Sequence, residues 1–147
     1  MGPRGGVLVV EDEVAARAAV SRMIRGIGYP VRSSRGGRDA LGFLRRHPVD
    51  VRLLLTDVTM PGMDGGELAE RALAAVPKIR IGLMADPSDG AAQGLVRAYP
   101  EFPVLNKPVS FSALLELLSR ELGPPGSPRH LPRKTGDRWQ RRRERRE

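Results

Sequence analysis

Short apolar runs alternate with longer amphipathic stretches along the first 122 residues of the chain. The spacing predicts strands at 7–10, 29–33, 51–56, 79–84 and 104–105. The runs at 7–10 and 51–56 are continuously apolar, which is typical of central parallel strands covered on both faces. Pro30 has no amide hydrogen to donate, so the strand at 29–33 is predicted at an edge of the sheet.

Helical spacing fills the intervals between these strands. Helices are predicted at 13–27, 38–46, 67–76 and 91–98, and a last helix, carrying Leu114, Leu115, Leu117, Leu118 and Leu122, is predicted after a cap at Ser110 or Ser112. In the first helix, Val14, Ala18, Met23 and Ile27 lie at roughly helical spacing, and Gly26 and Gly28 are expected to end it. In the second, Ala40, Leu41 and Leu44 are expected to point inward. Five strand–helix units predict an α/β fold built on a parallel sheet.

The composition changes after residue 123. Residues 124–147 hold nine Arg/Lys and three Asp/Glu, a net charge of +6, whereas residues 1–123 hold sixteen and fourteen. Because this end is rich in Pro and Arg and poor in apolar residues, it is predicted to be a disordered basic tail, 124–147, after a single domain, 1–123. The basic run 138–146 around Trp139 could bind nucleic acid or anionic lipid electrostatically, or could simply be solvated.

Other features of the composition exclude several classes of protein and of site. The chain has no cysteine, which excludes disulfides, thiolate metal sites and a thiol nucleophile. Its apolar runs are too short to span a bilayer, and the first residues lack a secretory core, so we expect a cytoplasmic protein. With 40% hydrophobic but only 4% aromatic residues, aliphatic side chains must fill the core.

Acidic residues follow two of the predicted strands. The first strand runs into Glu11-Asp12-Glu13, and the third runs into Asp57. Ligands of open parallel sheets bind beyond the carboxyl ends of the strands, so these acids would meet if the two strands are neighbours. Mutually repelling carboxylates suit a hard divalent cation such as Mg²⁺. Lys107, beyond the fifth strand, would complete a set suited to phosphoryl transfer, with a carboxylate as nucleophile.

Three blocks of sequence carry a resemblance to a known family. They are the residues at 7–13 (VLVVEDE), at 54–65 (LLTDVTMPGMDG) and at 106–108 (NKP). In their order and spacing they resemble the receiver domains of response regulators in two-component signalling, over about residues 6–122. The resemblance implies a flavodoxin-like (βα)5 fold with strand order 2-1-3-4-5 and helices on both faces.

The resemblance also implies roles for individual residues. Asp57 would be the phosphoacceptor, and Glu11, Asp12, Asp57 and the backbone carbonyl of Thr59 would bind Mg²⁺. Lys107 would pair with the phosphoryl group, aimed by a cis bond before Pro108. Without the resemblance, Asp57 could cap a turn, Glu11 and Asp12 could cap the first helix, and Lys107 could be a surface lysine.

Two positions depart from the family pattern. The fourth strand of a receiver usually ends in Ser or Thr, whose hydroxyl bonds the phosphoryl oxygen, but here Met84 takes that place. The aromatic partner expected three residues before the lysine is replaced by Val104. A thioether cannot donate a hydrogen bond, and Ser88 lies four residues further along, so we interpret Met84 as a core or rim filler. The acceptor chemistry is expected to be intact and the usual readout impaired.

The predicted function is phosphoryl acceptance from a histidine kinase or phosphotransfer protein, in a stand-alone receiver or one cut from a hybrid kinase. No separate output domain is expected after residue 122, so signalling would use protein–protein contact or a phosphate shuttle or sink. The domain would assist its own phosphorylation without being a turnover enzyme. Two alternatives remain open: a degenerate receiver that acts as a phosphorylation-independent binding module, and nucleic-acid binding through the tail.

Overall fold

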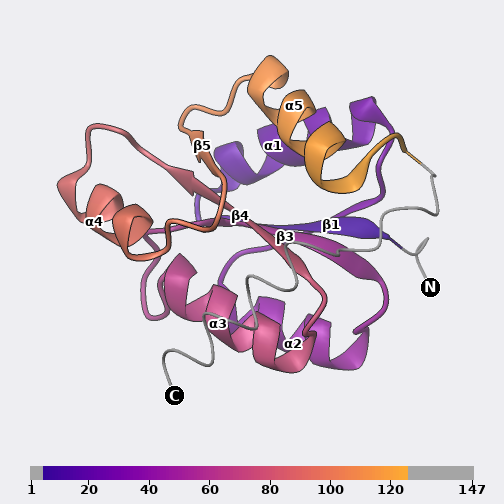
Figure 1. Cartoon of the computed structure of the whole chain (residues 1–147), viewed down its shortest axis with the longest axis horizontal. Coiled ribbons are helices and arrows are strands. Elements are labelled where there is room, and N and C mark those ends of the chain that lie inside the picture. The colour runs from indigo at the N-terminus through magenta and orange to yellow at the C-terminus, as the bar shows by residue number, and fades with distance from the viewer. Residues whose placement is uncertain (1–4, 126–147) are drawn as a thin grey trace.

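A single parallel sheet forms the centre of the computed structural model, which describes residues 5–125 (Figure 1). The strands are β1 (Gly6–Val10), β2 (Val31–Ser34), β3 (Val51–Asp57), β4 (Arg80–Ala85) and β5 (Val104–Asn106). Their order is β2-β1-β3-β4-β5, and all pairs are parallel. The predicted order and the edge position of β2 are thus confirmed.

Helices cover both faces of this sheet. They are α1 (Val14–Ile27), α2 (Gly37–Arg46), α3 (Gly65–Ala75), α4 (Gly90–Ala98) and α5 (Phe111–Leu122). Figure 1 shows α1 and α5 on one face and α2 and α3 on the other. Successive side chains of a strand point to opposite faces, so Val7 and Val9 pack with α1 and α5, while Leu8 and Val10 pack with α2 and α3.

Polar side chains set where the helices begin. Glu13 caps α1 through Ala16 N–H (3.1 Å), and Asp64 caps α3 through Glu67 N–H (2.8 Å). The Asp64 cap starts α3 at Gly65, two residues before its predicted start. Ser110, not Ser112, caps α5. Gly28, in the left-handed region at φ 117°, ends α1 as predicted.

The apolar spacing that predicted α1 marks its buried face only in part. Met23 and Ile27 are partly buried and pack against the core. Val14 is 68% exposed and Ala18 is exposed, whereas Val20 and Ile24 are buried. The four apolar positions include a step of five residues from Ala18 to Met23, which turns about 140° around a helix and cannot stay on one stripe. The Ala-rich first half of α1 left the choice of stripe to tertiary packing. The predicted core positions of α2, Ala40, Leu41 and Leu44, are all buried.

Long-range hydrogen bonds hold the end of α5 against the sheet. Arg52, at the start of β3, donates through Nη2 to the carbonyl of Leu122 (3.0 Å). The Tyr29 hydroxyl donates to the carbonyl of Gly123. These groups satisfy helix-end carbonyls that lack partners within the helix. They lie at the edge of the sheet opposite to the carboxyl ends of the strands.

Within residues 5–125, no helix is long and apolar enough to cross a bilayer. The predicted basic tail, 124–147, lies almost wholly outside the described residues, and its predicted disorder and binding remain predictions.

Two glycine substitutions test the packing of α3 on β3. A Cβ on Gly65 would clash with the backbone carbonyl of Asp57 and lie 2.8 Å from Val58 Cα. We expect Gly65→Ala to lower the free energy of unfolding by about 1–3 kcal/mol, as overpacking does. In the matched control, Gly94→Ala, the new Cβ meets nothing within 4 Å in helix α4, so stability should rise by about 0.5–1 kcal/mol. Urea unfolding measures both, and an equal effect of the two changes would contradict the close contact.

Candidate functional site

Three carboxylates meet at the carboxyl edge of the sheet. Glu11 and Asp12 follow β1, and Asp57 is the last residue of the neighbouring strand β3. One oxygen from each lies within 4.8 Å of the others, a grouping that could hold a metal ion. Glu11 is 1% and Asp57 4% exposed, while Asp12 is open to solvent. The parallel topology therefore brings together the three acids on which the sequence prediction depends.

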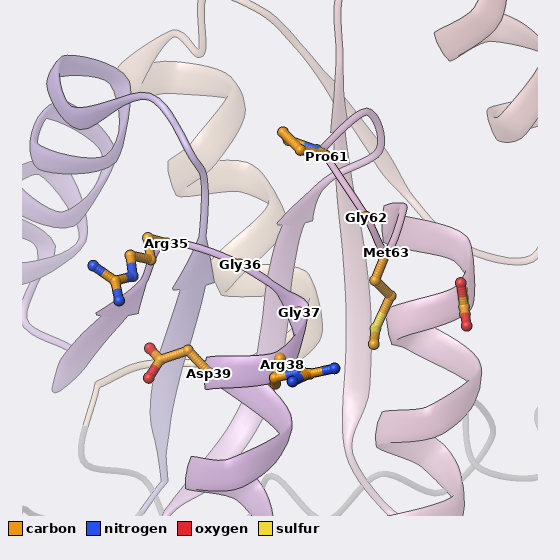
Figure 2. A pocket seen from close by; sticks show the side chains of 9 residues that line it. Arg35, Gly36, Gly37, Arg38, Asp39, Pro61, Gly62 and Met63 are labelled. Carbon is orange, nitrogen blue, oxygen red and sulfur yellow. The ribbon is translucent and has the colours of Figure 1, made fainter.

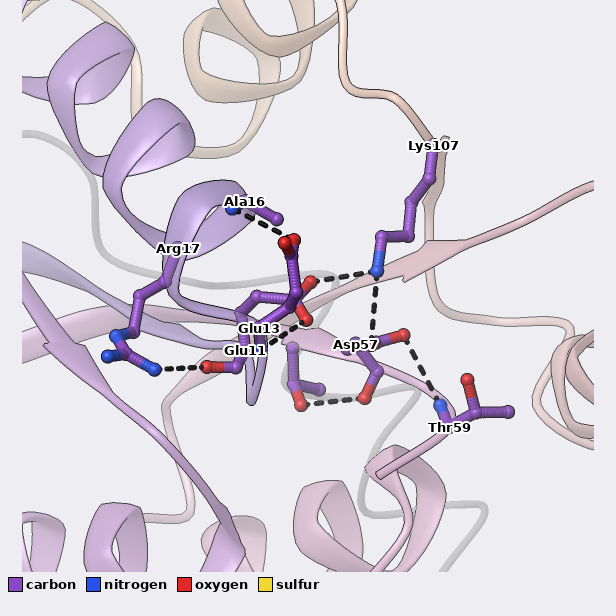
Figure 3. A network of polar contacts seen from close by, with 8 residues as sticks. Glu11, Glu13, Ala16, Arg17, Asp57, Thr59 and Lys107 are labelled. Atoms are coloured by element: carbon purple, nitrogen blue, oxygen red, sulfur yellow. Dashed lines mark hydrogen bonds and ion pairs between the residues drawn. The ribbon is translucent and has the colours of Figure 1, made fainter. Parts of the chain in front are cut away.

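Lys107 reaches into this group of acids from the end of β5. Its Nζ lies 2.8 Å from Glu11 Oε1 and 3.1 Å from Asp57 Oδ2 (Figure 3). Its backbone N–H donates to the carbonyl of Ala85 (2.9 Å), which continues the pairing of β5 with β4 past the strand end. The bond to Pro108 is cis, as the resemblance implied. Lys107 thus faces the acids and is not a free surface lysine.

Burial and neighbouring charges shift the proton affinities of this group. Burial raises the pKa of Glu11, and the Asp57 charge raises it further, against the opposing effect of Lys107. Burial alone would lower the pKa of Lys107, but hydrogen bonds to Glu11 and Asp57 outweigh it, and the net pKa is raised. Lys107 therefore remains an ammonium ion at neutral pH and offsets part of the negative charge.

Asp57 has a different neighbour on each side. Its Oδ1 accepts the Thr59 N–H (3.3 Å) and its Oδ2 faces Lys107. On the neighbouring strand β4, the residue in register with Asp57 is Met84. Its side chain is fully buried in the core between the sheet and helices α1 and α5. The β4 side of Asp57 is therefore apolar.

The donor set fits a hard divalent cation. Glu11, Asp12 and Asp57 offer only carboxylate oxygens, the ligands that Mg²⁺ prefers. The exposed position of Asp12 leaves one side of the group open to water, and Mg²⁺ usually keeps several water ligands. No other group of three metal-ligating side chains of this kind occurs within residues 5–125.

The two positions that depart from the family pattern have core roles. The burial of Met84 is what the core-filler interpretation predicted. Val104 is partly buried and packs on the opposite side of the sheet, with the core under α2 and α3. Ser88 is exposed, and its hydroxyl donates to Asp86 Oδ1 (2.8 Å). No hydroxyl from β4 therefore lies beside Asp57.

Sequence reasoning missed Arg17. Its Nη1 donates to the backbone carbonyl of Glu11 (2.9 Å), while Glu13 N–H donates to Glu11 Oε2 (3.2 Å) (Figure 3). One signal in the sequence could have pointed to it. An arginine lies six residues after the strand-end acid, at the fourth position of the following helix.

A hollow of 610 Å³ lies between the β2–α2 and β3–α3 loops (Figure 2). It is lined by Arg35, Gly36, Gly37, Arg38, Asp39, Pro61, Gly62, Met63 and Glu67. Its two acids are already engaged, since Glu67 pairs with Arg71 and Asp39 accepts the Ser34 hydroxyl hydrogen. None of the three clustered acids lines it, so this hollow is separate from the site at Asp57.

Comparison with known proteins agrees with the geometry. The family model of the response regulator receiver domain matches residues 7–119. The chain is 32% identical over 108 residues to the sensor kinase CckA of Brucella abortus, covering 74% of this chain and 11% of that protein. It is 31% identical over 121 residues to the DNA-binding transcriptional regulator NtrC of Salmonella typhimurium, covering 81% of this chain and 25% of that protein. The chain therefore spans a quarter or less of these relatives.

Solved structures show the same fold. The chemotaxis protein CheY4 of Vibrio cholerae superposes with a TM-score of 0.69 at 25% identity, covering 80% of this chain and 98% of that one. The receiver domain of the hybrid histidine kinase CckA superposes with a TM-score of 0.66 at 28% identity, covering 79% and 97%.

The raised pKa of Glu11 gives a pH test on metal-free protein. A carboxyl whose pKa is raised by folding stabilises the fold below its ordinary value of 4.5, and this contribution is lost as pH rises through the folded value. We therefore expect the wild type to lose stability relative to Glu11→Gln between pH 4.5 and neutrality. Urea unfolding of both proteins in EDTA measures the difference. If the wild type instead gains stability relative to the variant as pH rises over this range, the pairing of Glu11 with Lys107 lowers its pKa by more than burial raises it.

Proposed function

Because this chain belongs to the response regulator receiver domain family, we propose that Asp57 accepts a phosphoryl group from the phosphohistidine of a sensor histidine kinase or a phosphotransfer protein. A carboxylate oxygen of Asp57 attacks phosphorus, the phosphorus–nitrogen bond breaks, and the electron pair returns to the donor imidazole. Water later hydrolyses the acyl phosphate. The observation that carries the proposal is Lys107 Nζ between Glu11 and Asp57.

Each residue of the site has a proposed task. Glu11, Asp12, Asp57 and the carbonyl of Thr59 would hold Mg²⁺, which neutralises phosphoryl oxygens when bound. Lys107, 3.1 Å from Asp57 Oδ2, is placed to pair with an oxygen of the incoming group. The Thr59 N–H orients the acceptor carboxylate through Oδ1. The domain assists its own phosphorylation and dephosphorylation, and we propose that it is not a turnover enzyme.

Output is proposed to run through contact with another protein or through passing the phosphoryl group on, in the cytoplasm. A β4 hydroxyl cannot report the state of Asp57, because Met84 occupies that register position. This observation also favours a second candidate, a degenerate receiver that binds a partner regardless of phosphorylation. The acids and Lys107 favour the first.

Incubation with Mg²⁺ and a small-molecule acyl phosphate separates the two candidates. We expect a mass gain of one phosphoryl group that is lost in Asp57→Asn, because the amide is a poor nucleophile, and lost again in EDTA. Asp39→Asn, at an exposed acid outside the site, is the matched control and should label like the wild type. No gain from either the acyl phosphate or the cognate kinase would leave the binding module as the function.

Met84→Thr tests whether one hydroxyl restores the usual readout. Because Met84 is fully buried, we expect a loss of about 1–3 kcal/mol in the free energy of unfolding. We also expect no phosphorylation-dependent protection in residues 86–89 by amide hydrogen exchange, since Val104 lacks the aromatic ring. The double variant Met84→Thr, Val104→Tyr is the comparison. A loop shift in the single variant would contradict the expectation.

A further inference from the structure

The side chain of Arg17 contacts the backbone of the candidate site. Arg17 is the fourth residue of α1, and its guanidinium reaches back to the carbonyl oxygen of Glu11 (2.9 Å), in the turn between β1 and the helix. The backbone N–H of Glu11 is held on the other side by the carbonyl of Ser34 (3.1 Å). Both polar backbone groups of Glu11 are therefore fixed by partners outside β1.

The next residue, Asp12, depends on this backbone. Glu11 and Asp57 each touch Lys107 through their carboxylates. The carboxylate of Asp12 is exposed and has no hydrogen bond or ion pair within residues 5–125. The peptide group that joins Glu11 to Asp12 is planar, so fixing the Glu11 oxygen fixes the direction in which the chain enters Asp12.

We propose that Arg17 is a positioning residue, which holds the Glu11–Asp12 peptide plane so that the Asp12 carboxylate stays directed to the cation position shared with Glu11 and Asp57. The inference rests on the proposed metal centre and adds to it a residue that is not itself a ligand. Hydrogen bonds from charged donors are short and strong, and an orientation fixed before binding reduces the entropy lost when the cation arrives.

The charge of Arg17 and its proposed positioning role have opposite expected effects on Mg²⁺ affinity. Removing the positive charge of Arg17 makes the surroundings of the site more negative, so simple electrostatics predicts tighter Mg²⁺ binding without Arg17. Loss of positioning predicts weaker binding. A merely structural contact predicts a lower free energy of unfolding with unchanged Mg²⁺ affinity.

The experiment measures Mg²⁺ affinity by isothermal titration calorimetry on the full chain, with unfolding free energy in EDTA measured in parallel. We expect Arg17→Met to weaken Mg²⁺ binding by about five-fold, the equivalent of one hydrogen bond. Arg17→Lys, which keeps the charge and a donor, should recover part of the loss. Arg22→Met removes the same charge from an exposed position of α1 and should leave the affinity unchanged.

A second readout needs no metal. The amide nitrogen of Asp12 belongs to the peptide group that Arg17 holds, so its ¹⁵N shift in metal-free protein should move in Arg17→Met and stay in place in Arg22→Met. Tighter or unchanged Mg²⁺ binding by Arg17→Met would overturn the inference. If the wild type itself binds no Mg²⁺ at millimolar concentrations, the proposed metal centre fails first, and the inference fails with it.

Discussion

The bridge from Lys107 to Glu11 and Asp57 is the interaction on which the site depends. Two buried carboxylates and an exposed one lie at one edge of the sheet, and their charges repel. Lys107 offsets part of that repulsion, and its own pKa is raised by the same contacts. The arrangement leaves a concentrated negative site that could hold a divalent cation, with an ammonium ion already beside Asp57.

The environment of Asp57 is polar on one side and apolar on the other. Lys107 and the Thr59 amide contact its two oxygens, whereas β4 presents the buried Met84. A phosphoryl group on Asp57 would therefore meet a cation and a backbone N–H but no β4 hydroxyl. Any structural response to such a group is expected in the β3–α3 loop and around Lys107, which are the segments in contact with Asp57.

The sequence predicted elements with a continuous apolar pattern more accurately than elements with a weak apolar pattern. The continuous apolar runs gave β1 and β3 within one residue at either end, because strands buried on both faces tolerate few polar residues. In α1 the apolar spacing matched the buried face only in the second half, where Met23 and Ile27 pack on the core, whereas Val14 and Ala18 in the first half are exposed. Asp64 moved the start of α3 because a capping side chain, not the apolar pattern, sets a helix terminus.

By itself, the sequence determined the α/β class, the strand ends that carry Glu11, Asp12, Asp57 and Lys107, and the absence of a hydroxyl at position 84. These are local properties, set by apolar spacing and residue type. Only the tertiary structure decided that Lys107 contacts both acids, that Arg17 holds the Glu11 carbonyl, and that Arg52 and Tyr29 hold the end of α5. Most of these contacts join residues far apart in the chain, and even Arg17 reaches back over a full helical turn, so side-chain geometry and not sequence pattern selects the partner.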